Sequence, residues 1–123
     1  MPVFVVHEHN ARNLHYDFRL ELNGKLKSWA MRKIPPRRAG LKRLAIETED
    51  HRLPYAKFEG EIKEGYGKGT VKIWDSGSYG MKSNKKEKLV FELKGKKLNG
   101  TYVILRFKRA GPRQWIFFRK KAE

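Results

Sequence analysis

Residues 7–22 read HEHNARNLHYDFRLEL, and the second half of this stretch alternates apolar and ionisable side chains. The apolar members are Leu14, Tyr16, Phe18, Leu20 and Leu22, and the polar members between them are His15, Asp17, Arg19 and Glu21. A β-strand points successive side chains to opposite faces, so a period of two residues separates these sets. The pattern predicts a strand over 14–22, with one face in the core and one face rich in ionisable groups.

Further strand patterns follow this one, with few helical segments between them. Asn23-Gly24 is a typical two-residue hairpin turn, after which KLKSWAM, 25–31, returns as the partner strand. Later strands are expected at 43–49, 69–75, 88–94, 100–108 and 114–120, with a second tight turn at Asn99-Gly100. Short strands at regular spacing predict an all-β, mainly antiparallel fold, either a sandwich or a compact β barrel with short helical or irregular connections.

Composition narrows the class of protein. A chain of 123 residues has the usual size of one domain with one core. The sequence contains no cysteine, which excludes disulfides and thiolate metal sites and is compatible with a reducing compartment. No apolar run is long enough to cross a membrane, and MPVFVV does not resemble a signal peptide. We therefore expect a single domain over 1–123, located in the cytoplasm and without a membrane partner.

The charge balance is the strongest global feature. Lys and Arg together number 29 and Asp and Glu 13, which gives a net charge of +16. A small domain with this excess attracts polyanions, of which nucleic acid is the most common. The alternative is a solvated, lysine-rich surface with no particular partner. Charge alone therefore favours nucleic acid without naming a reaction.

The polar face of the 14–22 strand also has the composition of a metal site. His9 lies within reach of Asp17 across the intervening NARN segment, and His51 in the motif EDHRLPY offers a third ligand. Two imidazoles and a carboxylate suit Mn²⁺, Zn²⁺ or Fe²⁺ and leave coordination positions open. Arg19 matches phosphate oxygens, and His15 exchanges protons near neutral pH. These groups suit metal-assisted phosphoester hydrolysis, although a solvated strand face with a surface ion pair has the same pattern.

Three long motifs resemble the 3′-phosphoesterase module of bacterial and archaeal DNA ligase D. They are FVVHEHNARNLHYDFRLELNGKLKSWAMRK, EDHRLPYAKFEGEI and GYGKGTVKIWDSG, and the resemblance extends from about Phe4 to Trp115. It implies a compact β barrel with the active site on one concave face. It also implies a Mn²⁺-dependent activity that removes a 3′-terminal ribonucleoside and then hydrolyses the remaining 3′-phosphate. The repaired 3′-hydroxyl ends, on DNA or RNA/DNA primer-templates, would serve the ligase and polymerase of end joining.

The resemblance also implies roles for individual residues. It assigns His9, Asp17 and His51 as metal ligands, His15, Arg19 and Tyr55 as catalytic or phosphate-contacting residues, Lys33 and Arg43 as basic residues of the substrate pocket, and Glu21 as an orienting residue. Mn²⁺ is the metal of the family, with Zn²⁺ or Co²⁺ as alternatives because these ions accept the same nitrogen and oxygen ligands.

The chain departs from the family pattern at three points that affect these expectations. His7 stands where relatives often carry Gln, and we expect an edge-strand residue rather than an adventitious second imidazole. The segment EGYGKG is one residue shorter than the usual version, which leaves the shape of that loop open. The first motif begins almost at residue 1, where relatives often have an N-terminal arm that helps the diesterase step. The monoesterase step is therefore expected ahead of the diesterase step. A noncatalytic, basic nucleic-acid-binding β barrel and an enzyme for small phosphoesters remain the alternative functions.

Overall fold

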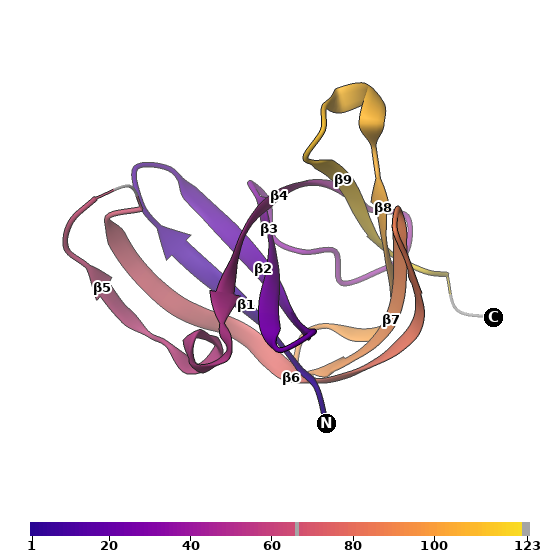
Figure 1. Cartoon of the computed structure of the whole chain (residues 1–123), viewed down its shortest axis with the longest axis horizontal. Coiled ribbons are helices and arrows are strands. Elements are labelled where there is room, and N and C mark those ends of the chain that lie inside the picture. Colours follow the sequence, from indigo (N-terminus) through magenta and orange to yellow (C-terminus); the bar gives the residue numbers. More distant parts are fainter. Residues whose placement is uncertain (66, 122–123) are drawn as a thin grey trace.

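The strands of the chain form a closed antiparallel β barrel, as expected from the sequence (Figure 1). The computed structural model describes residues 1–65 and 67–121. The strands are β1 (Val3–Asn10), β2 (Leu14–Leu22), β3 (Lys25–Met31), β4 (Lys42–Arg52), β5 (Gly60–Ile62), β6 (Gly69–Lys85), β7 (Lys88–Gly95), β8 (Asn99–Arg106) and β9 (Gln114–Arg119). Their order in the sheet is β1-β2-β3-β4-β9-β8-β7-β6-β5, and β1 also pairs with β6, which closes the ring.

The first hairpin forms as the sequence predicts. Asn23 and Gly24 have φ angles of 54° and 79°, both in the left-handed region that a tight hairpin turn requires. The turn fixes the register between β2 and β3, in which Arg19 pairs with Ser28 and Phe18 with Trp29. Each β2 side chain is therefore placed on the face that its period-two pattern predicts.

The second predicted turn is wrong by a few residues. Asn99 and Gly100 belong to β8, and Asn99 pairs with Lys94 across the ladder. The chain reverses at 95–98 instead, where the carboxylate of Asp75 accepts hydrogen bonds from three consecutive backbone N–H groups, those of residues 96, 97 and 98. Asp75 comes from β6, so a distant carboxylate sets this turn rather than the local Asn-Gly pair.

The inside of the barrel is filled by the apolar faces of the strands. Phe18 lies near its centre, with ring centroids 4.7 Å from Phe117 and 5.7 Å from Phe91. Trp29 and Tyr102 are also fully buried there. These rings fill the barrel, so it is a packed core and not a channel. Truncating one of these aromatic side chains to alanine typically costs about 3–5 kcal/mol.

The outer face of β1, β2 and β3 is also buried, which is unusual for a barrel wall. It is covered by the segment that contains the 3₁₀ helix η1 (Leu53–Lys57), which contacts β1, β3 and β4, and this segment continues into β5. Figure 1 shows η1 and β5 on one side of the barrel, with β7 to β9 on the opposite side. The side chains enclosed in this second layer include both apolar and ionisable ones: Val5, His7, Asp17, Arg19 and Leu26.

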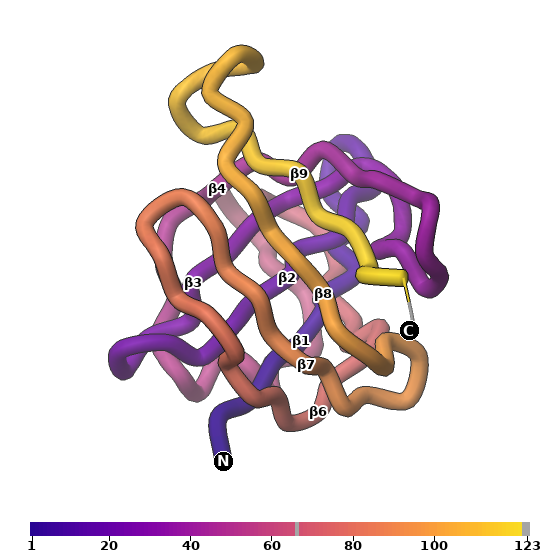
Figure 2. Tube along the Cα trace, turned by 90° about the vertical axis from the view of Figure 1, so that its right-hand side faces the viewer, coloured from indigo at the N-terminus to yellow at the C-terminus, as the bar shows by residue number. Residues whose placement is uncertain are grey.

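The connection between β8 and β9 extends past the end of the barrel and includes a short 3₁₀ helix, η2 (Lys108–Ala110) (Figure 2). Within residues 1–65 and 67–121, no helix has the length and apolar character to cross a membrane.

Candidate active site

The polar cluster lies where β1 and β2 pair, on the face covered by the η1 segment. The antiparallel register places His7 opposite Asp17 and His9 opposite His15. Directly opposed residues have Cβ atoms only about 4.5–5.5 Å apart, so this hairpin brings four ionisable side chains together. The three-residue connection at 11–13 makes the arrangement local in sequence.

His9, His15 and Asp17 form a group that could hold a metal ion, with one ligand atom from each residue within 4.8 Å of the others. The Oδ2 atom of Asp17 lies 3.6 Å from His9 Nδ1 and 3.3 Å from His15 Nε2. Among the described residues, this group contains His15 and does not contain His51. The geometry thus brings together two of the three ligands predicted from the sequence, and the third member of the group is His15, which was predicted as a catalytic residue.

Backbone carbonyls orient both imidazoles. His9 Nε2 lies 2.7 Å from the Gly67 carbonyl oxygen, and His15 Nδ1 lies 3.1 Å from the Asn13 carbonyl oxygen. Because a carbonyl only accepts hydrogen bonds, each of these nitrogens carries the proton and donates it. The other nitrogen of each ring faces Asp17, which is the arrangement found for metal-bound histidines.

Charge interactions in the cluster favour ionised Asp17. Burial alone raises the pKa of this carboxyl, but the hydrogen bond from His15 and the charge of Arg19 outweigh it, so the pKa is lowered. The pKa of His15 is raised, chiefly by its hydrogen bond to Asp17. The carboxylate is therefore available as a ligand at neutral pH.

Arg19 is held by three hydrogen bonds and is only 4% exposed. Its Nε donates to His7 Nδ1 at 3.0 Å, Nη1 to Ser28 Oγ at 2.8 Å and Nη2 to Asp17 Oδ2 at 3.3 Å. The guanidinium carbon also lies 5.0 Å from the centre of the Tyr55 ring. A guanidinium fixed on several sides presents its remaining donors in one orientation, which suits recognition of a phosphate.

His7 is a buried part of this network, so the prediction of an edge-strand residue is wrong. The residue is 0% exposed, and β1 pairs on both sides, with β2 and with β6. Its Nε2 donates to the Phe58 carbonyl oxygen at 3.1 Å, which leaves Nδ1 to accept from Arg19. Burial, together with the charge of Arg19, lowers the pKa of His7 to about 4. His7 is therefore neutral and links Arg19 to the covering segment.

His51 and Tyr55 lie on the Arg19 side of the cluster. Their rings are stacked with centroids 4.4 Å apart, and the Phe58 ring stacks on Tyr55 with centroids 5.1 Å apart. His51 pairs with Leu26, which in turn pairs with Glu21, so it lies four positions along β2 from Asp17. His51 is therefore not a member of the compact His9–His15–Asp17 group. Burial, followed by the charge of Arg19, lowers the pKa of His51.

The remaining predicted site residues lie further from the cluster. Glu21 accepts a hydrogen bond from the backbone N–H of Val3 at 3.0 Å, so its side chain contacts the start of β1. Lys33 is exposed and follows the end of β3, at the level of the His15 end of β2. Arg43 Nε donates to the Ile34 carbonyl at 2.7 Å and so fastens the loop next to Lys33.

Sequence comparison places the chain in a known family. Residues 7–106 match the family model described as the DNA Ligase D 3′-phosphoesterase domain. The chain is 44% identical over 125 residues to the multifunctional non-homologous end joining protein LigD of Pseudomonas aeruginosa, and 45% identical over 123 residues to the corresponding DNA repair protein of Mycobacterium tuberculosis. A LigD protein of Mycolicibacterium smegmatis is 38% identical over 130 residues.

Each of these matches covers 96% of the chain, and the chain spans only 15 to 17% of the length of these relatives. The similarity therefore concerns one module of much larger proteins. The matched region includes the candidate metal-binding group, Arg19, His51 and Tyr55. The chain belongs to the DNA ligase D 3′-phosphoesterase domain family.

Proposed function

We propose that the protein is a metal-dependent phosphoesterase that repairs the 3′ ends of nucleic acids. The observation that carries this proposal is the His9–His15–Asp17 group with the immobilised guanidinium of Arg19 beside it. A divalent metal and a fixed cation on one side of a phosphate are what phosphoester hydrolysis needs, because negative charge grows on the phosphate oxygens in the transition state. The family of the chain supports the same reaction class.

In this proposal His9, His15 and Asp17 hold the metal, and His51 is assigned to the phosphate together with Arg19 and Tyr55. The donor set fits Mn²⁺, Zn²⁺ or Co²⁺ because each imidazole is held by a backbone carbonyl through one nitrogen and turns the other towards the carboxylate, where a bound metal would take the place of the proton that His15 donates to Asp17. When bound, the metal would supply Lewis acidity at a phosphate oxygen. Arg19 orients the phosphate and stabilises its charge, and His51 lies where it can exchange a proton or donate a hydrogen bond.

The proposed substrates are 3′-phosphate and 3′-terminal ribonucleotide ends of DNA or RNA/DNA primer-templates, with Mn²⁺ as the metal. The product in both cases is a 3′-hydroxyl for the ligase and polymerase of non-homologous end joining. The names of the relatives, which are end-joining and DNA repair proteins, support this context. The net charge of +16 supports a polymeric anion as the substrate.

A direct test uses a 5′-labelled DNA strand with either a 3′-phosphate or one 3′-terminal ribonucleotide, annealed to a longer template. The products formed with and without Mn²⁺ are separated on a denaturing gel. We expect metal-dependent conversion of both ends to a 3′-hydroxyl, and loss of conversion in an Asp17→Asn variant that folds normally. Conversion at an undiminished rate by that variant would contradict the proposal.

Two other functions predict different results. A noncatalytic nucleic-acid-binding barrel would bind the DNA in a separate binding measurement but yield no product with any metal. An enzyme for small phosphoesters would act on a nucleoside 3′-phosphate with little dependence on salt. Activity on DNA ends should instead fall steeply as salt rises, because phosphate contacts release counterions.

A further inference from the structure

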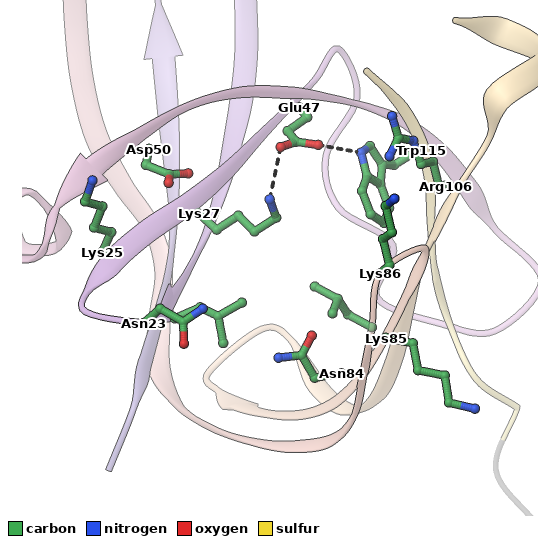
Figure 3. Close-up of a pocket in the computed structure, with 12 residues that line it drawn as sticks. Asn23, Lys25, Lys27, Glu47, Asp50, Asn84, Lys85, Lys86, Arg106 and Trp115 are labelled. Atoms are coloured by element: carbon green, nitrogen blue, oxygen red, sulfur yellow. Dashed lines mark hydrogen bonds and ion pairs between the residues drawn. The ribbon is translucent and has the colours of Figure 1, made fainter. Parts of the chain in front are cut away.

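A basic pocket separate from the candidate active site lies at one mouth of the barrel, behind the wall that carries that site. Its volume is about 350 Å³, and Figure 3 shows the residues around it. Five cationic side chains face two carboxylates there, a surplus of three positive charges: Lys25, Lys27, Lys85, Lys86 and Arg106 against Glu47 and Asp50. The pocket therefore attracts an anion.

Side-chain contacts hold Glu47 in place at the floor of this pocket. Lys27 Nζ lies 3.0 Å from Glu47 Oε2, and the Trp115 indole N–H donates to Glu47 Oε1 at 2.9 Å. Lys27 also lies over the Trp29 ring, 5.6 Å from its centre. Because Lys27 neutralises Glu47, the cations left for a ligand are those at the rim. The Lys27–Glu47 ion pair and Trp115 thus lie between the pocket and the core of the barrel.

The lining suits the phosphates of a nucleic-acid backbone. Trp115 is only 3% exposed and closes the pocket without offering a face for stacking, while Asn23 and Asn84 offer amide donors and acceptors. Figure 3 shows Lys86 and Arg106 beside Trp115, with Asn84 across the opening from Glu47. Cations that line an open groove follow the phosphate backbone of single-stranded nucleic acid whatever its base sequence.

Strands β3 and β4 carry pocket residues on one face and neighbours of the candidate active site on the other. Lys27 faces the pocket while the next residue, Ser28, binds Arg19. On β4, Asp50 lines the pocket and the adjacent His51 stacks on Tyr55. The rim between the two sites carries the exposed, paired residues Lys25 and Arg52. Positive charge therefore continues from one site to the other around the edge of the β2–β3 hairpin.

We propose that the barrel mouth is a second nucleic-acid contact, which holds backbone phosphates of a single-stranded segment. The inference extends the proposed function, because it takes nucleic acid as the ligand. It assigns to this pocket a role in holding the strand rather than in the reaction. The affinity for a substrate too short to reach the pocket would then not depend on the pocket.

The first test measures binding of a fluorescent oligothymidylate with a 3′-hydroxyl end, which the proposed reaction does not consume, over a series of salt concentrations. The Lys25→Gln/Lys86→Gln double variant removes two rim cations. The matched control is Lys120→Gln/Lys121→Gln, which removes two exposed cations from the basic pocket beside β8 and β9. If each rim lysine contacts one phosphate, the first variant should bind roughly tenfold or more weakly, with a salt slope smaller by about 1.4.

The control variant should lose much less affinity, and the Trp115 indole signal of the wild-type protein should move in a ¹H–¹⁵N spectrum when the oligonucleotide is added. Equal losses in both double variants would overturn the proposal, since they would reflect net charge alone. An unchanged affinity of the Lys25→Gln/Lys86→Gln variant would overturn it as well.

The second test separates this inference from the proposed function. Each variant is assayed on a nucleoside 3′-phosphate and on a longer DNA strand with a 3′-phosphate. The rim variant should keep its kcat/KM on the small substrate and show a raised KM on the strand. If the wild-type protein hydrolyses neither substrate while the rim variant alone loses binding, the pocket stands and the proposed function fails. If hydrolysis is seen and both variants bind alike, the function stands and the pocket fails.

Discussion

At the scale of single residues, the question with the largest consequence is which histidine completes the metal site. The geometry favours His15, whose Nε2 lies 3.3 Å from Asp17 Oδ2, whereas the family resemblance suggested His51. Replacement of a true ligand by alanine should weaken Mn²⁺ binding by about tenfold or more, since even the loss of a group that hydrogen-bonds to a ligand lowers metal affinity about 10–100-fold. We expect this loss for His15→Ala and near-normal Mn²⁺ affinity for His51→Ala, measured by the electron paramagnetic resonance signal of free Mn²⁺. The opposite result would restore His51 as the ligand.

His7 is a second residue whose role can be tested by substitution. Leucine at this position leaves Arg19 Nε without its acceptor and the Phe58 carbonyl without its donor, and a buried unpaired group costs about 1–3 kcal/mol. His7→Leu should therefore lower the free energy of unfolding in urea and reduce kcat on a 3′-phosphate strand by roughly tenfold. His7→Gln offers both a donor and an acceptor, so it should restore much of each quantity. Identical losses in the two variants would show that bulk, not hydrogen bonding, matters at this position.

At the scale of elements, the loop between β5 and β6 orients His9, a proposed metal ligand. Gly67 has a φ of +94°, which favours glycine, and its carbonyl accepts the His9 Nε2 proton at 2.7 Å. A Cβ added at Gly67 would lie 3.5 Å from the His9 ring, whereas one added at Gly65, with a φ of +87°, would meet nothing within 4 Å. The glycine-rich segment therefore serves to position the His9 imidazole.

These two glycines form a matched pair for experiment. Alanine at either position carries a similar backbone cost of about 1–2 kcal/mol for a left-handed residue. Only Gly67→Ala should also displace the carbonyl that fixes His9, so Mn²⁺ affinity should fall by about tenfold in this variant and stay near normal in Gly65→Ala. Isothermal titration calorimetry would measure both affinities. Equal affinities would mean that His9 does not depend on this loop.

The elements also show what the sequence reveals and what it does not. The period of two in β2 and the turn at Asn23-Gly24 are enough to predict the hairpin, and that register also pairs Arg19 with Ser28. Ser28 could therefore have been found as a partner of Arg19 from the sequence alone. The carbonyls of Phe58 and Gly67 could not, because they act through backbone atoms of irregular segments. The Asn99-Gly100 turn was wrong for a related reason, since Asp75 in a distant strand determines where the chain reverses.

At the scale of the whole molecule, the buried network makes stability depend on pH. The pKa of His7 is about 4 in the folded protein against 6.5 for an exposed histidine, so the unfolded chain binds the proton more readily. His7 therefore contributes fully above pH 6.5, and its contribution is lost as the pH falls from 6.5 towards 4. Complete loss corresponds to about 3 kcal/mol. Arg19, Asp17 and His51 are the charged or titratable groups around it.

Comparison with His7→Gln isolates this effect from the other titrating groups. The free energy of unfolding, measured in urea at several pH values, should fall more steeply for the wild-type protein than for His7→Gln between pH 6.5 and 4. The two curves should run parallel above pH 6.5. A constant difference over the whole range would show that protonation of His7 does not drive the loss.

The pairing of β1 with β6 has a consequence for synthesis of the protein. The β1–β2 hairpin, which carries His9, His15 and Asp17, is complete within the first 22 residues. The partners that orient and cover it, from His51 to Gly67 and then β6, leave the ribosome tens of residues later. A nascent chain thus exposes a loosely organised ligand set well before the barrel closes around the second edge of β1. Closure through contacts so distant in sequence is intrinsically slow, so newly made protein should acquire its full affinity for metal only as it reaches the native state.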